Sequence, residues 1–407
     1  MKTPALHWQI LIAIILAVLF GVYFNQYIHA VTWMGVLFLR ALKMLIVPLI
    51  LTSIASGIAN IGSGDALGKM GIKTLAYYLT TSIFAILTGL LLVNLIGPGK
   101  GVDAAFMGSA EAIVVPNERP SLERTLYEII PTNIFSALTN AKMLSIIFFG
   151  LLAGYFITTL TKKHKEFMIT GLNAGFELMM KLTNFVIKFT PIGVFGLVAK
   201  TVADHVDELD VLAERLGMYS LTVACALLVH FLIVLPILLK VLGKINPRQH
   251  LKSMTVPLLT AFSTSSSAAT LPLTINAIEK KAGASNKVTS FVLPLGATIN
   301  MDGTALYECV AVMFLAQLHG IELSIVEQSV VVSTALLASI GAAGIPMAGL
   351  VMMSVVLSAV NLPLEWVAVI FPVDRILDMG RTAVNVWSDS CGAVIIAKSE
   401  GETLNYQ

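Results

Sequence analysis

The chain has 407 residues, of which 57% are hydrophobic and only 12% are charged, and its mean hydropathy is +0.86. A soluble domain typically carries about twice that charged fraction. The chain therefore has more apolar surface than a soluble fold can hide, and lipid must be the solvent for much of it. The net charge of +2 leaves no basic excess for nucleic acid, and the three cysteines stand at no spacing typical of a metal site.

Apolar stretches of about twenty residues predict membrane-spanning helices. In chain order these stretches cover 8–28, 34–61, 73–96, 133–160, 170–199, 216–241, 286–316 and 364–398. Two more apolar segments, 248–281 and 325–361, are broken by Ser, Gly and Pro clusters. The fold class that we predict is an all-α membrane protein with about eight transmembrane helices.

The charges of the connections predict the orientation. One set of connections is basic, with residues such as Lys163 and Lys244, whereas the alternate set is acidic around Asp207. Basic loops stay in the cytoplasm, so both termini are expected there. The basic loops all lie on the cytoplasmic side only if 248–281 and 325–361 do not cross the membrane. We therefore expect these two segments to be re-entrant hairpins, one entering from each side. Hairpin tips at membrane depth are tolerated where they are buried in protein or line a watery cavity, as in transporters.

The last predicted span carries a polar stripe. At about 100° per residue, Asp378, Arg381, Thr382, Asn385 and Asp389 share an arc of about 100°. Ionisable groups inside a span indicate a functional site. The alternative is a structural ion-pair network that holds the helices together.

Two further clusters point to ligand binding. The seventh span is interrupted by Asn300-Met301-Asp302-Gly303-Thr304, and a helix that unwinds there offers carbonyl and carboxylate oxygens to a hard cation such as sodium. A simple kink is the alternative. The first hairpin has a serine-rich tip at 263–267, and serines there also serve as helix caps.

Together these motifs closely resemble the glutamate transporters, the dicarboxylate/amino acid:cation symporter family. The resemblance rests on 300–304, on the serine-rich tip ending in Thr270-Leu271-Pro272, on 341–346, and on Asp378-Met379-Gly380-Arg381-Thr382 with Asn385 and Asp389. It covers nearly the whole chain. It implies a homotrimer in the plasma (inner) membrane, built from inverted repeats and working as an elevator.

The resemblance also implies a division of each subunit into domains. Residues 1–72 and 131–215 are expected to form a scaffold. Residues 73–130 hold the third span and an external loop, and 216–407 form the rest of the transport domain with both hairpins.

The resemblance implies a site for an acidic amino acid. Its residues are Arg381, Asp378, Thr382, Asn385, Thr304, Ser267, Ser266, Ile345 and Gly349. Arg381 is expected to bind the side-chain carboxylate, since a guanidinium grips a carboxylate with two hydrogen bonds. Asp378 is expected to take the ammonium, and the two hairpin tips the α-carboxylate. Aspartate and glutamate present the same charges, so the sequence does not rank them.

The resemblance further implies three sets of sodium ligands. The first is Asp389, Asn300 and carbonyls near Gly296 and Asn385; the second is Asp302, Asn300, Thr81, Ser82 and Tyr78; the third is the carbonyls of Thr298, Ser339, Ile340 and Ala342.

The chain departs from the family pattern at the substrate site. Archaeal members have an Arg at the position of Ser265 and animal members have one at the position of Met379, but this chain has neither. Arg375 is a nearby substitute for balancing Asp378. Glu308 matches the animal pattern. The resemblance therefore implies a coupling role for Glu308, together with Met301 in the interruption of the seventh span. Protons and potassium are thereby added to sodium as candidate coupling ions.

Other functions remain open at this point. The first alternative is a proton-coupled symporter for dicarboxylates or neutral amino acids with the same fold. Asp378 argues against dicarboxylates, which have no ammonium to pair with it. An intramembrane hydrolase would need a base beside a serine of the first tip, and all seven histidines lie outside the polar clusters in the sequence. The chain is therefore not expected to be an enzyme.

Overall fold

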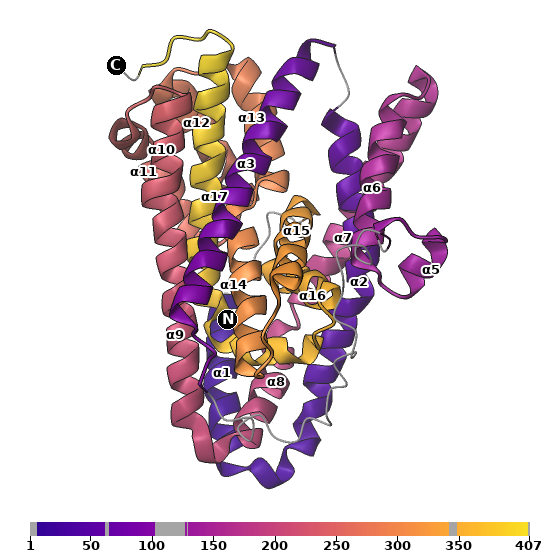
Figure 1. Ribbon diagram of the computed structural model, residues 1–407, viewed down its shortest axis with the longest axis vertical. Coiled ribbons are helices and arrows are strands. Elements are labelled where there is room, and N and C mark those ends of the chain that lie inside the picture. Colours follow the sequence, from indigo (N-terminus) through magenta and orange to yellow (C-terminus); the bar gives the residue numbers. More distant parts are fainter. Residues whose placement is uncertain (1–5, 62–64, 102–126, 128, 342–347, 406–407) are drawn as a thin grey trace, which may run out of the picture.

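The structure is a computed structural model that describes all residues except 1–5, 62–64, 102–126, 128, 342–347 and 406–407. Among the described residues the regular elements are all helices (Figure 1). This confirms the predicted all-α fold class.

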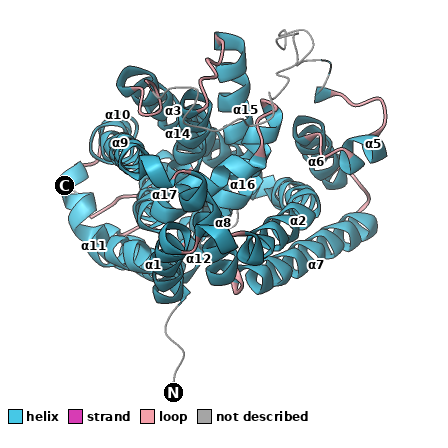
Figure 2. Ribbon diagram, turned by 90° about the horizontal axis from the view of Figure 1, so that it is seen from below, coloured by secondary structure: helices cyan, strands magenta, loops and turns pink. Residues whose placement is uncertain are grey.

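A first group of helices, which we call the first bundle, comprises α1, α2 and α5–α8. Their bounds are α1 Leu6–Tyr23, α2 His29–Ile61, α5 Ile134–Thr139, α6 Met143–Thr158, α7 Lys162–Ile187 and α8 Thr190–Asp204. Helix α2 packs against α6, α7 and α8, and α1 packs against α8. Figures 1 and 2 both show α2, α6 and α7 on one side of the molecule, away from α9, α10 and α11.

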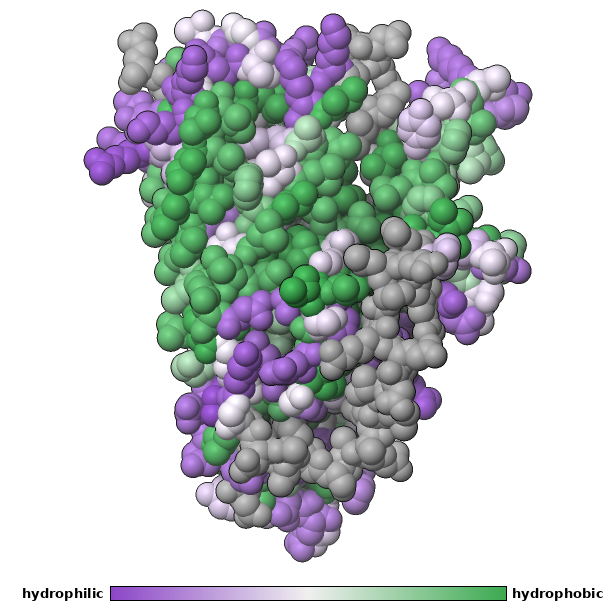
Figure 3. All heavy atoms as spheres, viewed as in Figure 1, coloured by the Kyte–Doolittle hydropathy of each residue, from purple (hydrophilic) through white to green (hydrophobic). Residues whose placement is uncertain are grey.

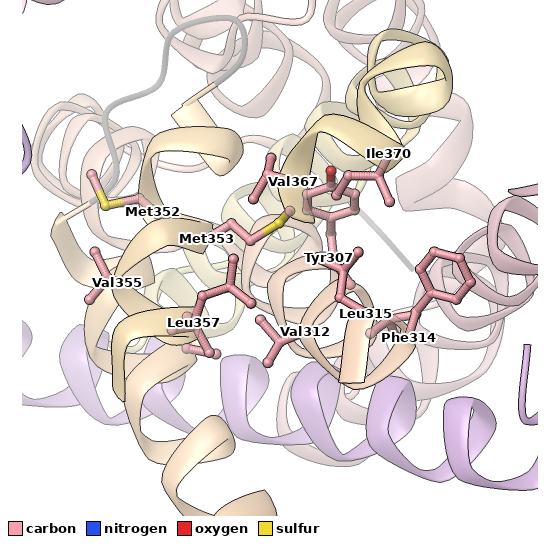
Figure 4. Packing of buried hydrophobic residues seen from close by; sticks show 14 of the residues in the cluster. Tyr307, Val312, Phe314, Leu315, Met352, Met353, Val355, Leu357, Val367 and Ile370 are labelled. Atoms are coloured by element: carbon pink, nitrogen blue, oxygen red, sulfur yellow. The ribbon is translucent and has the colours of Figure 1, made fainter. Parts of the chain in front are cut away.

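The remaining helices form the second bundle. Their bounds are α3 Asp65–Ile96, α9 Leu209–Val229, α10 Leu235–Leu242, α11 Pro247–Thr264, α12 Ser267–Ala277, α13 Asn286–Ile299, α14 Asp302–Leu318, α15 Ile325–Gly341, α16 Ala348–Ala359 and α17 Phe371–Ser399. Helix α14 lies at the centre and packs against α3, α9, α15, α16 and α17. Side chains from α14, α16 and the 3₁₀ segment η6 (Leu364–Ile370), among them Tyr307, Met353 and Val367, meet in one apolar layer (Figure 4).

Both predicted hairpins appear as helix pairs that fold back on themselves. Helices α11 and α12 pack against each other, as do α15 and α16. The turn between α11 and α12 uses Ser265 in the left-handed conformation, with φ 51°. Ser266 then caps α12, because its side chain accepts a hydrogen bond from the N–H of Ala269. The tip between α15 and α16 lies outside the described residues.

The predicted interruption of the seventh span is confirmed. Helix α13 ends at Ile299 and α14 begins at Asp302, and the backbone of Asn300 is extended, with φ −95° and ψ 92°. The polar side chains at this break therefore lie between two helix ends inside the second bundle, where both α13 and α14 pack against α3, α15 and α17.

Two predicted spans are not single helices. The expected span 170–199 is bent by 55° between α7 and α8, because Pro191 near the start of α8 has no N–H to continue the helix. The expected span 133–160 is divided into α5 and α6 at Asn140–Lys142, where Ala141 has φ 50°. The remaining predicted spans match helices or helix pairs within about ten residues at their ends.

The molecule carries apolar helices suited to a membrane. Four described helical stretches are long and apolar enough to cross one: His29–Asn60, Lys69–Ile96, Leu209–Leu242 and Asn286–Leu318; the bent pair α7–α8 makes a fifth. A broad apolar band lies between polar ends on the face that Figure 3 shows.

Candidate functional site

The polar stripe of α17 forms an ion cluster around Arg381. The guanidinium Nη2 of Arg381 lies 3.0 Å from Oδ1 of Asp374 and 2.8 Å from Oδ1 of Asp378. The side chains of Arg381 and Asp374 are each only 1% exposed. Because one cation and two anions are withdrawn from water here, each must be compensated inside the protein.

Tyr307 of α14 completes the surroundings of this guanidinium. Its hydroxyl donates to Oδ1 of Asp374 at 2.6 Å, and its ring centroid lies 3.7 Å from Cζ of Arg381, a cation–π distance. The two other nitrogens of Arg381, Nε and Nη1, are buried and have no hydrogen-bond partner among the described residues. A buried donor without a partner is costly, and a ligand carboxylate is the group that accepts two such N–H bonds.

The side of Arg381 that carries Nη1 faces the second hairpin. A Cβ added to Gly349 of α16 would lie 2.6 Å from Nη1 and 3.5 Å from Cγ2 of Thr304. Thr304 Oγ1 in turn accepts a hydrogen bond from Asn385 Nδ2 at 3.2 Å. Four predicted substrate residues, Arg381, Gly349, Thr304 and Asn385, are thus brought together from α14, α16 and α17.

The remaining predicted substrate residues are only partly linked to this centre. Thr382 follows Asp378 on α17 and donates to its backbone carbonyl at 2.8 Å. Ser266 and Ser267 lie at the tip of the first hairpin, where Ser267 is buried, and their role as ligands stays a prediction. Ile345 lies outside the described residues.

Oxygen atoms gather at the break between α13 and α14. Asn300 Nδ2 donates to Oδ1 of Asp389 at 2.8 Å and to Oγ of Ser388 at 3.0 Å. Asn300 Oδ1 lies 3.4 Å from Oγ1 of Thr81, which belongs to α3. One asparagine therefore bridges the first two predicted sodium sets, and both sets are rich in the oxygen donors that a hard cation prefers.

The second predicted set is assembled between α3 and α14. Ser82 Oγ donates to Oδ1 of Asp302 at 2.7 Å, and Asp302 is fully buried. The hydroxyl of Tyr78 donates to the carbonyl of Val292 and lies close to Gly296, where an added Cβ would be 2.6 Å from both Tyr78 Oη and Asp389 Oδ1. Only glycine leaves room for these oxygens at that position.

The third predicted set is the least complete. Ser339 and Ile340 are buried on α15 and Thr298 is exposed on α13, and these two helices contact each other. Ala342 lies outside the described residues, so this set stays a prediction.

Comparison with known sequences decides the class of protein. The Sodium:dicarboxylate symporter family matches residues 6–399. The chain belongs to this family. The symporter is 35% identical to the "Proton/glutamate-aspartate symporter" of Escherichia coli (strain K12), over 97% of this chain and 93% of that protein. It is 35% identical to the "Proton/sodium-glutamate symport protein" of Geobacillus stearothermophilus, over 99% and 96%, and 34% identical to "Excitatory amino acid transporter 3" of Mus musculus, over 91% and 79%.

Membership confirms the resemblance that the motifs indicated. The family consists of transporters, so the symporter is a multi-pass membrane protein and not an enzyme. The hydrolase alternative is thereby excluded.

Three residues of the symporter's polar centre were not predicted individually. His230 Nε2 lies 3.1 Å from Oδ2 of Asp302, and both side chains are fully buried. This histidine is remote from the motifs in the sequence, and a π-helical segment at His230–Val234 directs it inward. Asp374 and Tyr307 each had a signal in the sequence, because Asp374 is four residues before Asp378 on one helix and Tyr307 is one turn after the break.

Glu308 of the symporter is fully buried on α14, and neither of its carboxylate oxygens has a hydrogen-bond partner among the described residues. Burying a carboxylate without a hydrogen-bond partner is costly, and the role of Glu308 in coupling stays a prediction.

Proposed function

We propose that this symporter carries aspartate or glutamate across the plasma membrane together with sodium. One observation carries the proposal: a buried guanidinium, Arg381, has two nitrogens without hydrogen-bond partners among the described residues and stands beside the carboxylate of Asp378. A ligand that has both a carboxylate and an ammonium complements this pair. The names of the relatives, which mention glutamate and aspartate, support the same substrate class.

Sodium is proposed as a coupling ion from the oxygen-rich break. Asp302 and Asp389 are both buried, and Asn300, Thr81 and Ser82 add neutral oxygens. A cation offsets the cost of burying the two carboxylates. Binding of the ion and of the substrate is then reciprocally linked, since the same break supplies Thr304 to the substrate side.

The two bundles suggest the division of labour that the resemblance implies. The first bundle is proposed as a scaffold for a homotrimer, and the second bundle as the part that carries the substrate and slides as an elevator. The support is that the residues described for the polar centre lie on α3, α13, α14, α16, α17, the break at Asn300 and the π-helical segment His230–Val234, all outside the first bundle. Both termini are proposed to be cytoplasmic.

Uptake measurements test this function. The purified protein is placed in liposomes, and labelled aspartate and glutamate are offered while gradients of sodium, protons and potassium are imposed one at a time. An inward sodium gradient is expected to drive accumulation of either substrate, and liposomes with Arg381→Ala provide the baseline. Accumulation that ignores sodium, or none for either amino acid, contradicts the proposal.

A proton or potassium ion is proposed as a further coupling ion through Glu308. The support is the buried carboxylate of Glu308, which has no hydrogen-bond partner among the described residues, and the word "Proton" in the names of bacterial relatives. The test compares wild type with Glu308→Gln in liposomes loaded with potassium, sodium or choline at several pH values. Dependence on pH or on internal potassium that the Gln variant loses supports this role. Uptake that is indifferent to all of these changes leaves a symporter coupled to sodium alone.

A further inference from the structure

Asp378 is held by two arginines from opposite sides. Oδ1 of Asp378 lies 2.8 Å from Arg381 and Oδ2 lies 3.3 Å from Nη1 of Arg375. The Asp378 side chain is 8% exposed, and that of Arg375 is 18% exposed. Both oxygens of the carboxylate are therefore engaged by cations of the protein itself.

Arg375 binds the oxygen of Asp378 that the ammonium of the ligand would also bind. If Asp378 receives the ammonium of an acidic amino acid, a premise that rests on the proposed function, then Oδ2 is the oxygen not already committed to Arg381. We propose that Arg375 acts as an internal substitute for this ammonium, and that it thereby sets how strongly the site prefers amino dicarboxylates over plain dicarboxylates.

This role has opposite consequences for the two ligand classes. An amino dicarboxylate must displace Arg375 from Oδ2, so part of the attraction between its ammonium and Asp378 is offset. A dicarboxylate without an amino group leaves Arg375 in place and meets a carboxylate whose charge is already balanced. Without Arg375, that ligand would approach a carboxylate that has lost one of its two arginines, and like charges at close range repel.

Arg375 and Asp378 are also spaced as an ordinary pair on a helix surface, three residues apart. Two observations distinguish this pair from one that only stabilises the helix. Asp378 is buried and its other oxygen is bound to the guanidinium that faces Gly349 and Thr304. Asp374, the nearest other anion on α17, has its Oδ1 taken by Arg381 and Tyr307. Arg375 is thus bound to an acid whose other oxygen binds Arg381.

The test measures binding of L-aspartate and of succinate to the full-length protein in lipid nanodiscs at saturating sodium. In Arg375→Ala the Kd of aspartate is expected to fall and that of succinate to rise. The ratio of the two constants should change by roughly five- to tenfold, because the two constants shift in opposite directions. Arg375→Lys keeps the charge and should stay near the wild-type ratio. Arg248→Ala removes an exposed charge from the start of α11 and is the matched control.

Each outcome decides the inference. Equal changes in the Kd of both ligands overturn the inference, because they indicate only a general loss of positive potential. No change in either Kd also overturns it, because Arg375 and Asp378 would then be an ordinary surface pair. If Arg375→Ala is not recovered in folded form, Arg375→Gln carries the same comparison. A wild-type protein that binds succinate but neither amino acid contradicts the proposed function, and the succinate constant of the variant then decides the role of Arg375 alone. A wild type that binds none of these ligands overturns both.

Discussion

The two bundles differ in what they bury. Among the described residues, every buried charged side chain lies in the second bundle, whereas the buried polar groups of the first bundle are serines and threonines such as Ser56 and Thr183. The most apolar stretch of α2 is 44% buried, and that of α13–α14 is completely buried. The described part of the first bundle therefore packs without any buried charged side chain. The second bundle holds charges that cost stability in a membrane, and buried charges of this kind indicate a functional site.

The largest effect that tests this contrast is expected at Arg381. Arg381→Ala removes the cation that compensates Asp374 and Asp378, and breaking a buried ion pair costs about 3–5 kcal/mol. Binding of aspartate, measured by calorimetry in sodium, should become undetectable. Arg40→Ala removes an exposed arginine from α2 in the first bundle and should leave binding unchanged. Aspartate affinity close to wild type in Arg381→Ala would show that the substrate lies elsewhere.

A smaller but clear effect is expected at Asp389. Asp389→Asn keeps the shape of the side chain and removes the charge that would hold sodium at the break. Since ion and substrate binding are linked, the sodium concentration that half-saturates aspartate binding should rise by at least roughly tenfold. Asp210→Asn changes an exposed acid at the start of α9 and serves as the control. An unchanged sodium dependence in Asp389→Asn would remove Asp389 from the sodium site.

The sequence predicted the parts of the fold that follow from local rules. The break at Asn300 and the turn at Ser265 were foreseen because glycine, serine and asparagine clusters interrupt apolar segments. The bend between α7 and α8 was missed, although Pro191 signals it, because the apolar pattern continues across the proline without change. A span assignment based on hydropathy alone does not register such a bend.

The site was predictable where its members share a helix. Asp378, Arg381 and Asn385 could be related by the period of α17. The contact between His230 and Asp302 joins residues from α9–α10 and α14, and only tertiary packing brings them within 3.1 Å. The sequence gives no register between two apolar helices, so partners of this kind cannot be found by periodicity.

Replacing one helical glycine in each bundle by alanine compares how tightly the two bundles are packed at those positions. Gly296→Ala would place a methyl group 2.6 Å from Oδ1 of Asp389, and overpacking of this kind costs about 1–3 kcal/mol. Gly171→Ala on α7 meets nothing within 4 Å and should stabilise by up to about 1 kcal/mol through helix propensity. Thermal unfolding in detergent measures both. A Gly296→Ala protein as stable as wild type would mean that the second bundle is loosely packed around its oxygens.

The smallest effect concerns the contact between the bundles. Lys43 Nζ of α2 lies 2.9 Å from Oε1 of Glu365 in η6, and the side chains are 47% and 64% exposed. An exposed pair of this kind contributes only about 0.2–1 kcal/mol and weakens with salt. A double-mutant cycle with Lys43→Ala and Glu365→Ala, read from unfolding in low and in high salt, should give a coupling in that range that falls as salt rises.

The position of the Lys43–Glu365 pair makes its small coupling free energy informative about the arrangement of the two bundles. Lys43 lies about 20 Å along α2 from the start of that helix, yet Glu365 belongs to the segment that leads into α17. If the second bundle slides along the first, as proposed, the pair exists only when η6 is level with the middle of α2. The coupling should then change when sodium and aspartate shift the population between arrangements, because a ligand favours the arrangement to which it binds more tightly. A coupling that is the same with and without these ligands would instead indicate that the two bundles keep one fixed arrangement.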